Sequence, residues 1–189
     1  LEESDSMKGD RRYKITDLVT LQIFEGEIVP GGDYQSKNLK AVFSIFNNLQ
    51  GIFTFSDRNI TDGIRNVVIN TGLIGRWQIL SNQPLTICDT GHNKEGLECV
   101  IDQILRIPKS GLHMIIGFVN DKDLKSVLPL FPTDATYYFT KASIPRALNE
   151  ENLKSEAVKY GLNGQSYPDV KTALYYARNN AAQADRIFI

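Results

Sequence analysis

The sequence has too few cysteines and histidines for a disulfide-rich or zinc-dependent protein. Its 189 residues include two cysteines, Cys88 and Cys99, and two histidines, His92 and His113. The cysteines form no CxxC pair, so buried, reduced thiols are the simplest interpretation. No ligand spacing surrounds either histidine. We therefore expect no metal site made by residues of this chain alone.

An excess of charge of one sign and a long apolar run are also missing. The chain has 21 basic and 22 acidic residues and a pI near 6.2, which gives no electrostatic reason to expect nucleic acid or an anionic membrane as a partner. No apolar segment approaches the roughly 20 residues that span a bilayer. The first residues, LEESDSMKGDRR, are too charged for a secretory signal. These absences favour a cytoplasmic protein that acts on small molecules.

Two common nucleotide-binding motifs do not occur. A nicotinamide cofactor would need G-x-G-x-x-G at the first strand-to-helix turn, and the stretch CDTGHNKEG does not supply it. The phosphate loop G-x-x-x-x-G-K-[ST] is found nowhere in the chain. If a nucleotide is used, we expect its phosphates to be held mainly by residues outside this sequence.

From about residue 76, short apolar runs alternate with amphipathic segments. Strands are expected at 85–88, 112–119, 135–140, 164–167 and 186–189, and helices at 94–106, 122–130, 149–160 and 169–182. Alternation with short connections predicts an α/β fold, a Rossmann-like, mainly parallel sheet with helices on both faces.

The first part of the chain has a different pattern. Val19, Leu21 and Ile23 alternate like a strand before the break VPGG. Two amphipathic helices are expected after it, at residues 39–49 and 60–69, the second with Ile60, Ile64, Val67 and Val68 inward. The glycines of NTGLIGRWQIL then predict a hinge. We therefore expect one domain over residues 1–70 and another over residues 71–189.

Polar residues gather after the first strand of the second part. Asp89, His92 and Asn93 lie between the strand at 85–88 and the helix that begins at residue 94. Each has a structural interpretation, as a turn-capping acid, a packed histidine and a helix N-cap. The functional interpretation is a ligand site, because α/β sheets bind ligands beyond the carboxyl ends of their strands, where an acid commonly accepts hydrogen bonds from ribose.

Two other stretches allow both kinds of interpretation. Arg76 is either a solvated hinge residue or a phosphate clamp, since a guanidinium offers paired donors. The stretch NDKDL at 120–124 either caps a helix with acidic residues or forms a second wall of the same crevice. The tyrosines at 137, 138, 175 and 176 are assigned to packing alone.

Four ordered motifs resemble one family. GRWQIL followed by PLTICDTGHNKEGL is similar to the opening of the C-terminal domain of folylpolyglutamate synthase and dihydrofolate synthase, the folate branch of the Mur ligase superfamily. GGDYQSKNLKAVFSIFNNL resembles the end of that family's central ATPase domain, and GFVNDKDL and TKASIPRAL resemble later segments. The resemblance implies that residues 1–70 are the C-terminal part of the central domain and residues 71–189 a C-terminal domain truncated at its end.

The resemblance also implies an activity. It points to an ATP-dependent amide ligase, using Mg²⁺, that joins L-glutamate to dihydropteroate or a folate through an acyl phosphate. Arg76 and His92 would face the ATP phosphates and the reacting acyl phosphate, Asp89 would bind the ribose, and Asn38 would border the adenine. Lys122 and Asp123 are weaker candidates for the amino-acid side of the cleft.

Some family features are missing. Ile74 stands where the family usually has proline, and the phosphate loop, the magnesium ligands, the modified lysine and the Gly-Ser segment after the last strand are absent. We therefore expect a fragment that is inactive by itself and whose partners are the missing domains of the same chain, with no nucleic acid and no membrane. Two alternatives stay open, a Mur-type ligase for peptidoglycan precursors and a non-catalytic α/β nucleotide-binding module. The sequence does not distinguish dihydrofolate synthesis from polyglutamate extension.

Overall fold

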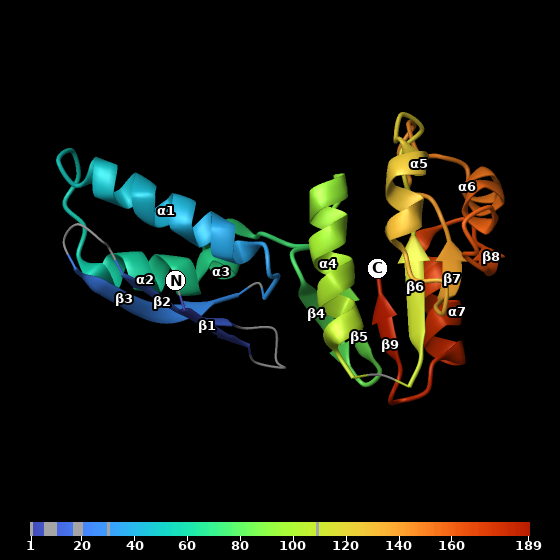
Figure 1. Cartoon of the computed structure of the whole chain (residues 1–189), viewed down its shortest axis with the longest axis horizontal. Coiled ribbons are helices and arrows are strands. Elements are labelled where there is room, and N and C mark those ends of the chain that lie inside the picture. Colours follow the sequence, from blue (N-terminus) through green and yellow to red (C-terminus); the bar gives the residue numbers. More distant parts are fainter. Residues whose placement is uncertain (1, 6–10, 17–20, 30, 109) are drawn as a thin grey trace. The chain divides into compact units, whose positions relative to one another are not determined.

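The computed structural model of the chain describes residues 2–5, 11–16, 21–29, 31–108 and 110–189. The chain forms two compact units, Leu1–Gln78 and Ile79–Ile189, called here the first and second unit (Figure 1). The expected domain boundary after residue 70 stays a prediction, as does the assignment of residues 1–70 to a central ATPase domain.

The first unit is a three-stranded antiparallel sheet with helices. Its strands β1 (Glu2–Asp5), β2 (Arg11–Thr16) and β3 (Ile23–Ile28) lie in that order. Strands β1 and β2 were not predicted: β1 is wholly polar in sequence, and in β2 the alternation of Tyr13 and Ile15 was overlooked because it spans only two apolar residues. The strand expected around Val19 begins at Ile23, and Val19 and Pro30 lie outside the described residues.

The described helices of the first unit are α1 (Gln35–Leu49), α2 (Asp57–Arg65) and α3 (Val67–Thr71). Helices α1 and α2 pack their apolar residues with those of the sheet. Tyr13, Phe24, Ile28, Leu39, Phe43, Ile60 and Ile64 form one buried cluster. The predicted single helix at 60–69 was wrong, since α2 ends before Asn66 and α3 follows it. Val67 and Val68 are accordingly only half-buried.

Glycines end the helical part of the first unit. Gly72, with φ +67°, follows α3, and its N–H donates to the carbonyl of Val68 at 2.8 Å. Gly75 has φ +68°. Both values lie in the left-handed region that glycine adopts without steric cost, so the segment expected to be a hinge does carry two sharp backbone turns.

The second unit is built on a six-stranded sheet in the order β4-β5-β9-β6-β7-β8. The strands are β4 (Gln78–Asn82), β5 (Leu85–Cys88), β6 (Leu112–Ile116), β7 (Thr136–Phe139), β8 (Gly164–Ser166) and β9 (Arg186–Phe188). Strands β5, β9, β6, β7 and β8 pair in parallel. Strand β4 lies in the stretch expected to be a hinge, and its two-residue connection to β5 permits only antiparallel pairing.

Helices connect the parallel strands. They are α4 (Lys94–Arg106), α5 (Leu124–Val127), the 3₁₀ turn η1 (Leu128–Leu130), α6 (Glu150–Val158) and α7 (Val170–Asn180). The helix expected at 122–130 is shorter, because Pro129 lacks the N–H that would continue α5. None of the described helices is long and apolar enough to cross a membrane.

The connections place helices on both faces of the sheet. The crossovers through α4, α5 and α6 carry the chain across the sheet from β5 to β6, β7 and β8. The crossover through α7 carries it back from β8 to β9, between β5 and β6 (Figure 1). Right-handed crossovers then put α7 on the opposite face. Ala173 and Ala177 of α7 pack with Ile115, Tyr138 and Ile187 of the sheet. The predicted mainly parallel α/β fold is confirmed.

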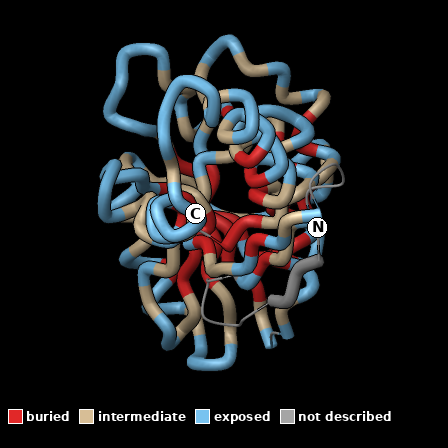
Figure 2. Tube along the Cα trace, turned by 90° about the vertical axis from the view of Figure 1, so that its left-hand side faces the viewer, coloured by how far each residue is buried: buried red, intermediate tan, exposed pale blue. Residues whose placement is uncertain are grey.

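The central strands of the second unit are its buried layer. All five residues of β6 are buried, as expected for a central parallel strand covered on both sides. In Figure 2 the buried stretches of the trace, in red, lie inside exposed, pale blue segments. Tyr137 and Tyr138 belong to this core, as predicted, whereas Tyr175 and Tyr176 are exposed on α7. The connecting loops carry most of the exposed residues, so the polar loops at the carboxyl ends of the strands are accessible.

Candidate functional site

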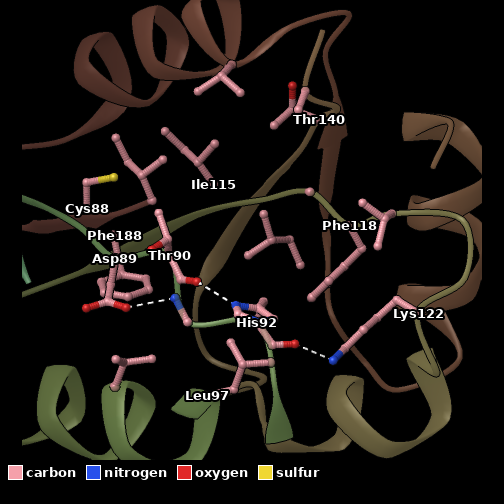
Figure 3. Close-up of a pocket in the computed structure, with 18 of the residues that line it drawn as sticks. Cys88, Asp89, Thr90, His92, Leu97, Ile115, Phe118, Lys122, Thr140 and Phe188 are labelled. Atoms are coloured by element: carbon pink, nitrogen blue, oxygen red, sulfur yellow. Dashed lines mark hydrogen bonds between the residues drawn. The ribbon is translucent and has the colours of Figure 1, made fainter. Parts of the chain in front are cut away.

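A cavity of about 380 Å³ lies at the carboxyl ends of β5, β9, β6 and β7 (Figure 3). Its wall is mainly apolar and comes from the strand ends, α4 and the loops that follow β6 and β7. The polar side chains in its lining are Asp89, Thr90, His92, Lys122 and Thr140. Parallel α/β folds bind ligands at this edge of the sheet. The cavity therefore lies where the turn after residues 85–88 was expected to face a ligand.

Asp89 is the first residue after β5 and is half-buried. Its Oδ1 accepts a hydrogen bond from the N–H of Gly91 at 2.8 Å, and its own N–H donates to the carbonyl of Ile189 at 2.9 Å. The turn-capping interpretation of this acid is therefore confirmed. An ionised carboxylate only accepts hydrogen bonds, so an acceptor is the chemistry that Asp89 offers a ligand.

His92 is exposed beside the start of α4 (Figure 3). Its Nδ1 lies 3.2 Å from the carbonyl oxygen of Thr90. When Nδ1 carries the proton and donates to that oxygen, Nε2 is the acceptor. Asn93 is the N-cap of α4, as predicted, with Oδ1 accepting from the N–H of Gly96 at 2.9 Å. The N-terminal end of a helix attracts anions, and His92 immediately precedes its cap.

Lys122 also belongs to the cavity wall, from the loop after β6. Its ammonium donates a hydrogen bond to the main-chain carbonyl of His92, which joins this loop to the loop after β5 (Figure 3). Asp123 does not line the cavity. It is the N-cap residue of α5, its side chain makes no capping bond, and its carbonyl accepts the Ser126 hydroxyl at 2.9 Å.

Arg76 and Asn38 belong to the first unit, Leu1–Gln78. Arg76 is half-buried and precedes Trp77, which is buried and has φ +49°. Asn38 is exposed on α1, and its amide donates to Oε1 of Gln35 at 2.7 Å. The structure thus brings together Asp89, His92 and Lys122 in one cavity. The phosphate and adenine contacts of Arg76 and Asn38 stay predictions.

Two cavity residues were missed by sequence reasoning. Thr140 is 2% exposed, and its hydroxyl has no hydrogen-bond partner among the described residues. It directly follows β7, the same kind of position that singled out Asp89 after β5. Cys88 lines the cavity as well. Burial, together with the nearby Asp89 charge, raises the pKa of the Cys88 thiol, so it is neutral and a poor nucleophile.

Over the described ranges, no group of three or more histidine, cysteine, aspartate or glutamate side chains is arranged to hold a metal ion.

The second unit matches a known family. A family model described as Mur ligase, glutamate ligase domain, matches residues 75–189, more than half of the chain. The chain belongs to the Mur ligase family. The resemblance seen in the four sequence motifs is therefore confirmed.

Similar proteins lie in the folate branch of the Mur ligases. The chain is 29% identical over 136 residues to the dihydrofolate synthase/folylpolyglutamate synthase of Escherichia coli, covering 71% of this chain and 30% of that protein. It is 27% identical over 177 residues to a probable bifunctional folylpolyglutamate synthase/dihydropteroate synthase of Haloferax volcanii, covering 92% of this chain and 20% of that protein. The chain thus spans less than a third of the length of either relative.

Solved structures give the same result for this Mur ligase chain. Escherichia coli FolC in complex with DHPP and ADP aligns with a TM-score of 0.62 at 28% identity, covering 72% of this chain and 32% of that one. Mycobacterium tuberculosis folylpolyglutamate synthase complexed with ADP aligns over the whole chain and 44% of its own, with a TM-score of 0.80 at 17% identity. The second alignment shows the fold alone.

Proposed function

We propose that this chain is part of an ATP-dependent ligase that adds L-glutamate to dihydropteroate or a folate. The observation that carries the proposal is the placement of Asp89 and His92 on one cavity at the carboxyl ends of the strands, in a chain of the Mur ligase family. The names of the similar proteins support the folate branch over a peptidoglycan ligase. A cytoplasmic location fits such substrates.

The residues of the second unit suit a nucleotide. A half-buried carboxylate at a strand end is the kind of acceptor that ribose hydroxyls need, which supports Asp89 as the ribose ligand. His92 lines the cavity and immediately precedes the N-cap of α4, which supports a phosphate position near this helix start. Bound ATP would supply the phosphoryl group that activates the carboxylate substrate. Mg²⁺, with ligands mainly in other domains of the protein, would screen the negative charge of the ATP phosphates.

The chain's own residues then have separate roles. His92 would stabilise the charge that develops on the acyl phosphate, and Arg76 would clamp the phosphates with its paired donors. Asn38 would border the adenine. Lys122 and Asp123 are proposed for the amino-acid side. The geometry supports Lys122 better, because it lines the cavity and Asp123 does not.

The test uses the full-length ligase with ATP, glutamate and dihydropteroate. His92→Ala and Arg76→Ala should each lower turnover by roughly 10²- to 10³-fold, the usual loss when one charge-stabilising donor is removed. Arg178→Ala, at an exposed position of α7, is the matched control and should leave turnover unchanged. Near-normal rates in the first two variants would contradict the proposed roles.

Two further measurements separate the alternatives. A nucleotide-linked peptide in place of dihydropteroate should give no product, and product formation with it would indicate a peptidoglycan ligase. The 189-residue chain alone should show no ligase activity and only weak ATP binding, since the phosphate loop is missing from it. Tight ATP binding by this chain would favour a non-catalytic nucleotide-binding module.

A further inference from the structure

Three loops at the carboxyl edge of the second unit are joined in series. The loop after β7 pairs with the loop after β6. The N–H of Leu148 donates to the carbonyl of Phe118 at 2.8 Å, and the N–H of Asn120 donates to the carbonyl of Arg146 at 2.8 Å. Val119 and Ala147 form a β-bridge between these two bonds. The loop after β6 is therefore held from one side by main-chain hydrogen bonds.

Lys122 continues this connection to the loop after β5. Its N–H donates to the carbonyl of Val119 at 3.1 Å, which closes a turn on the residue of the β-bridge. Its ammonium donates to the carbonyl of His92 (Figure 3). The Lys122 side chain thus links the braced loop to the loop that carries Asp89 and His92.

The loop after β5 is also fixed at its two ends. At its start, the N–H of Asp89 donates to the carbonyl of Ile189, the residue after β9. At its end, the Asn93 side chain caps α4. Between them, Asp89 with Gly91 and His92 with Thr90 make contacts inside the loop itself.

We propose that Lys122 is a positioning residue that acts through the main chain of His92. An ammonium-to-carbonyl hydrogen bond is charge-assisted and therefore stronger than a neutral one. By holding the His92 carbonyl, it fixes the peptide plane from which the imidazole projects, and with it the turn whose N–H at Gly91 orients the Asp89 carboxylate. This role rests on the proposed function, in which both side chains contact the nucleotide.

The first test measures the loop in the 189-residue chain by amide hydrogen exchange. Lys122→Met keeps the aliphatic stem and removes the donor, and it should make the Gly91 amide exchange about tenfold faster, as expected for the loss of a hydrogen bond to a charged group. Lys122→Arg, which keeps a cationic donor, should restore slow exchange. Lys125→Met, at an exposed position of α5, is the control and should change nothing.

Exchange at Ile104, buried in α4, reports whether the fold is intact in each variant. Should Lys122→Met not fold, Lys122→Gln provides a shorter, neutral replacement for the same comparison. Unchanged exchange at Gly91 in a folded variant, or an equal change in Lys125→Met, would overturn the proposal.

The second test is kinetic and uses the full-length ligase. Lys122→Met should lower kcat by about 10²-fold, the effect of a small misplacement of a reacting group, with partial rescue by Lys122→Arg. Unchanged Gly91 exchange together with a rise in KM for glutamate alone would leave Lys122 with only the glutamate contact proposed above, and would overturn the positioning role. If the unmodified ligase makes no folate product while Lys122→Met still loosens the loop, the proposed function fails and the positioning of His92 stands.

Discussion

Tyr13 in β2 lies opposite Gly26 in β3, and its ring restricts which residue can stand at position 26. A Cβ atom built on Gly26 would be 2.7 Å from the Tyr13 hydroxyl oxygen and 2.9 Å from Cζ, so the ring occupies the space that a side chain would need. Burial raises the pKa of Tyr13 to about 12, so the phenol is neutral over the physiological range.

Gly26→Ala is therefore expected to destabilise the first unit by about 1–3 kcal/mol, the usual cost of overpacking a core. Gly63→Ala is the matched control, because Gly63 is exposed in α2 and nothing lies within 4 Å of its built Cβ. The control should raise stability by about 0.5–1 kcal/mol, since glycine weakens a helix. Urea unfolding followed by circular dichroism measures both, and a shift of the same sign in the two variants would contradict this account.

Single residues also mark how far the site could be predicted. Asp89, His92 and Asn93 were found because an apolar strand pattern and an apolar helix pattern meet at them. Thr140 was missed, since a threonine after a strand is ordinary in sequence and only its burial and missing partner distinguish it. The bond from Lys122 reaches a main-chain carbonyl, and no pattern of side chains encodes such a contact.

At the scale of elements, Asp185 joins β9 to its surroundings. Its Oδ2 accepts the N–H of Ala182 at 2.7 Å and lies 3.3 Å from Nε2 of His113 in β6, whose Nδ1 is 3.0 Å from the Tyr138 hydroxyl. The Ala182 bond, and then His113, lower the pKa of Asp185 below its usual 3.8. The carboxylate therefore stabilises the fold above that pH, and its contribution is lost as the pH falls through the lowered pKa.

Asp185→Asn should accordingly lower the free energy of unfolding at pH 7 by about 1 kcal/mol, because bonds to the charged oxygen become neutral ones. The difference from the unmodified chain should shrink below pH 3.8. Asp134→Asn, at an exposed position before β7, is the control. Thermal unfolding at pH 7 and pH 3 provides the measurement, and a constant difference at both pH values would show that the charge has no part in it.

Elements differ in how well their sequence predicted them. Helix α4 was placed correctly because its apolar spacing and its Asn93 cap agree. Strand β1 was missed because it is polar and pairs only with β2, and pairing leaves no trace in a short polar segment. Strand β2 was missed because its apolar positions, Tyr13 and Ile15, are too few to form a recognisable alternation. The break at Asn66 was missed because the apolar spacing continues through it.

At the scale of the whole molecule, the described cores are separate. The cluster around Phe43 contains only residues of the first unit, and the cluster around Ile115 contains only residues of the second. Each unit thus supplies its own apolar burial, which is the main source of a domain's stability.

Phe43→Ala should remove about 3–5 kcal/mol from the first unit, a large part of the stability of any small domain. Amide exchange should become much faster at Phe24 and Ile64 and stay unchanged at Ile115 and Tyr138. Ile187→Ala is the reciprocal variant and should affect the second unit alone. Loosening of both units by either substitution would show that they unfold as one cooperative body.

Strand β9 follows the other described strands of the second unit in sequence but lies third in the sheet, between β5 and β6. While the polypeptide is being synthesised, the β4-β5 hairpin and the β6-β7-β8 ladder have no strand to bridge them until residues 186–188 leave the ribosome. The cavity that holds Asp89 and Lys122 is thus assembled only after residues 186–188 have been made, and a stop codon shortly before β9 would leave two separate ladders with exposed edges.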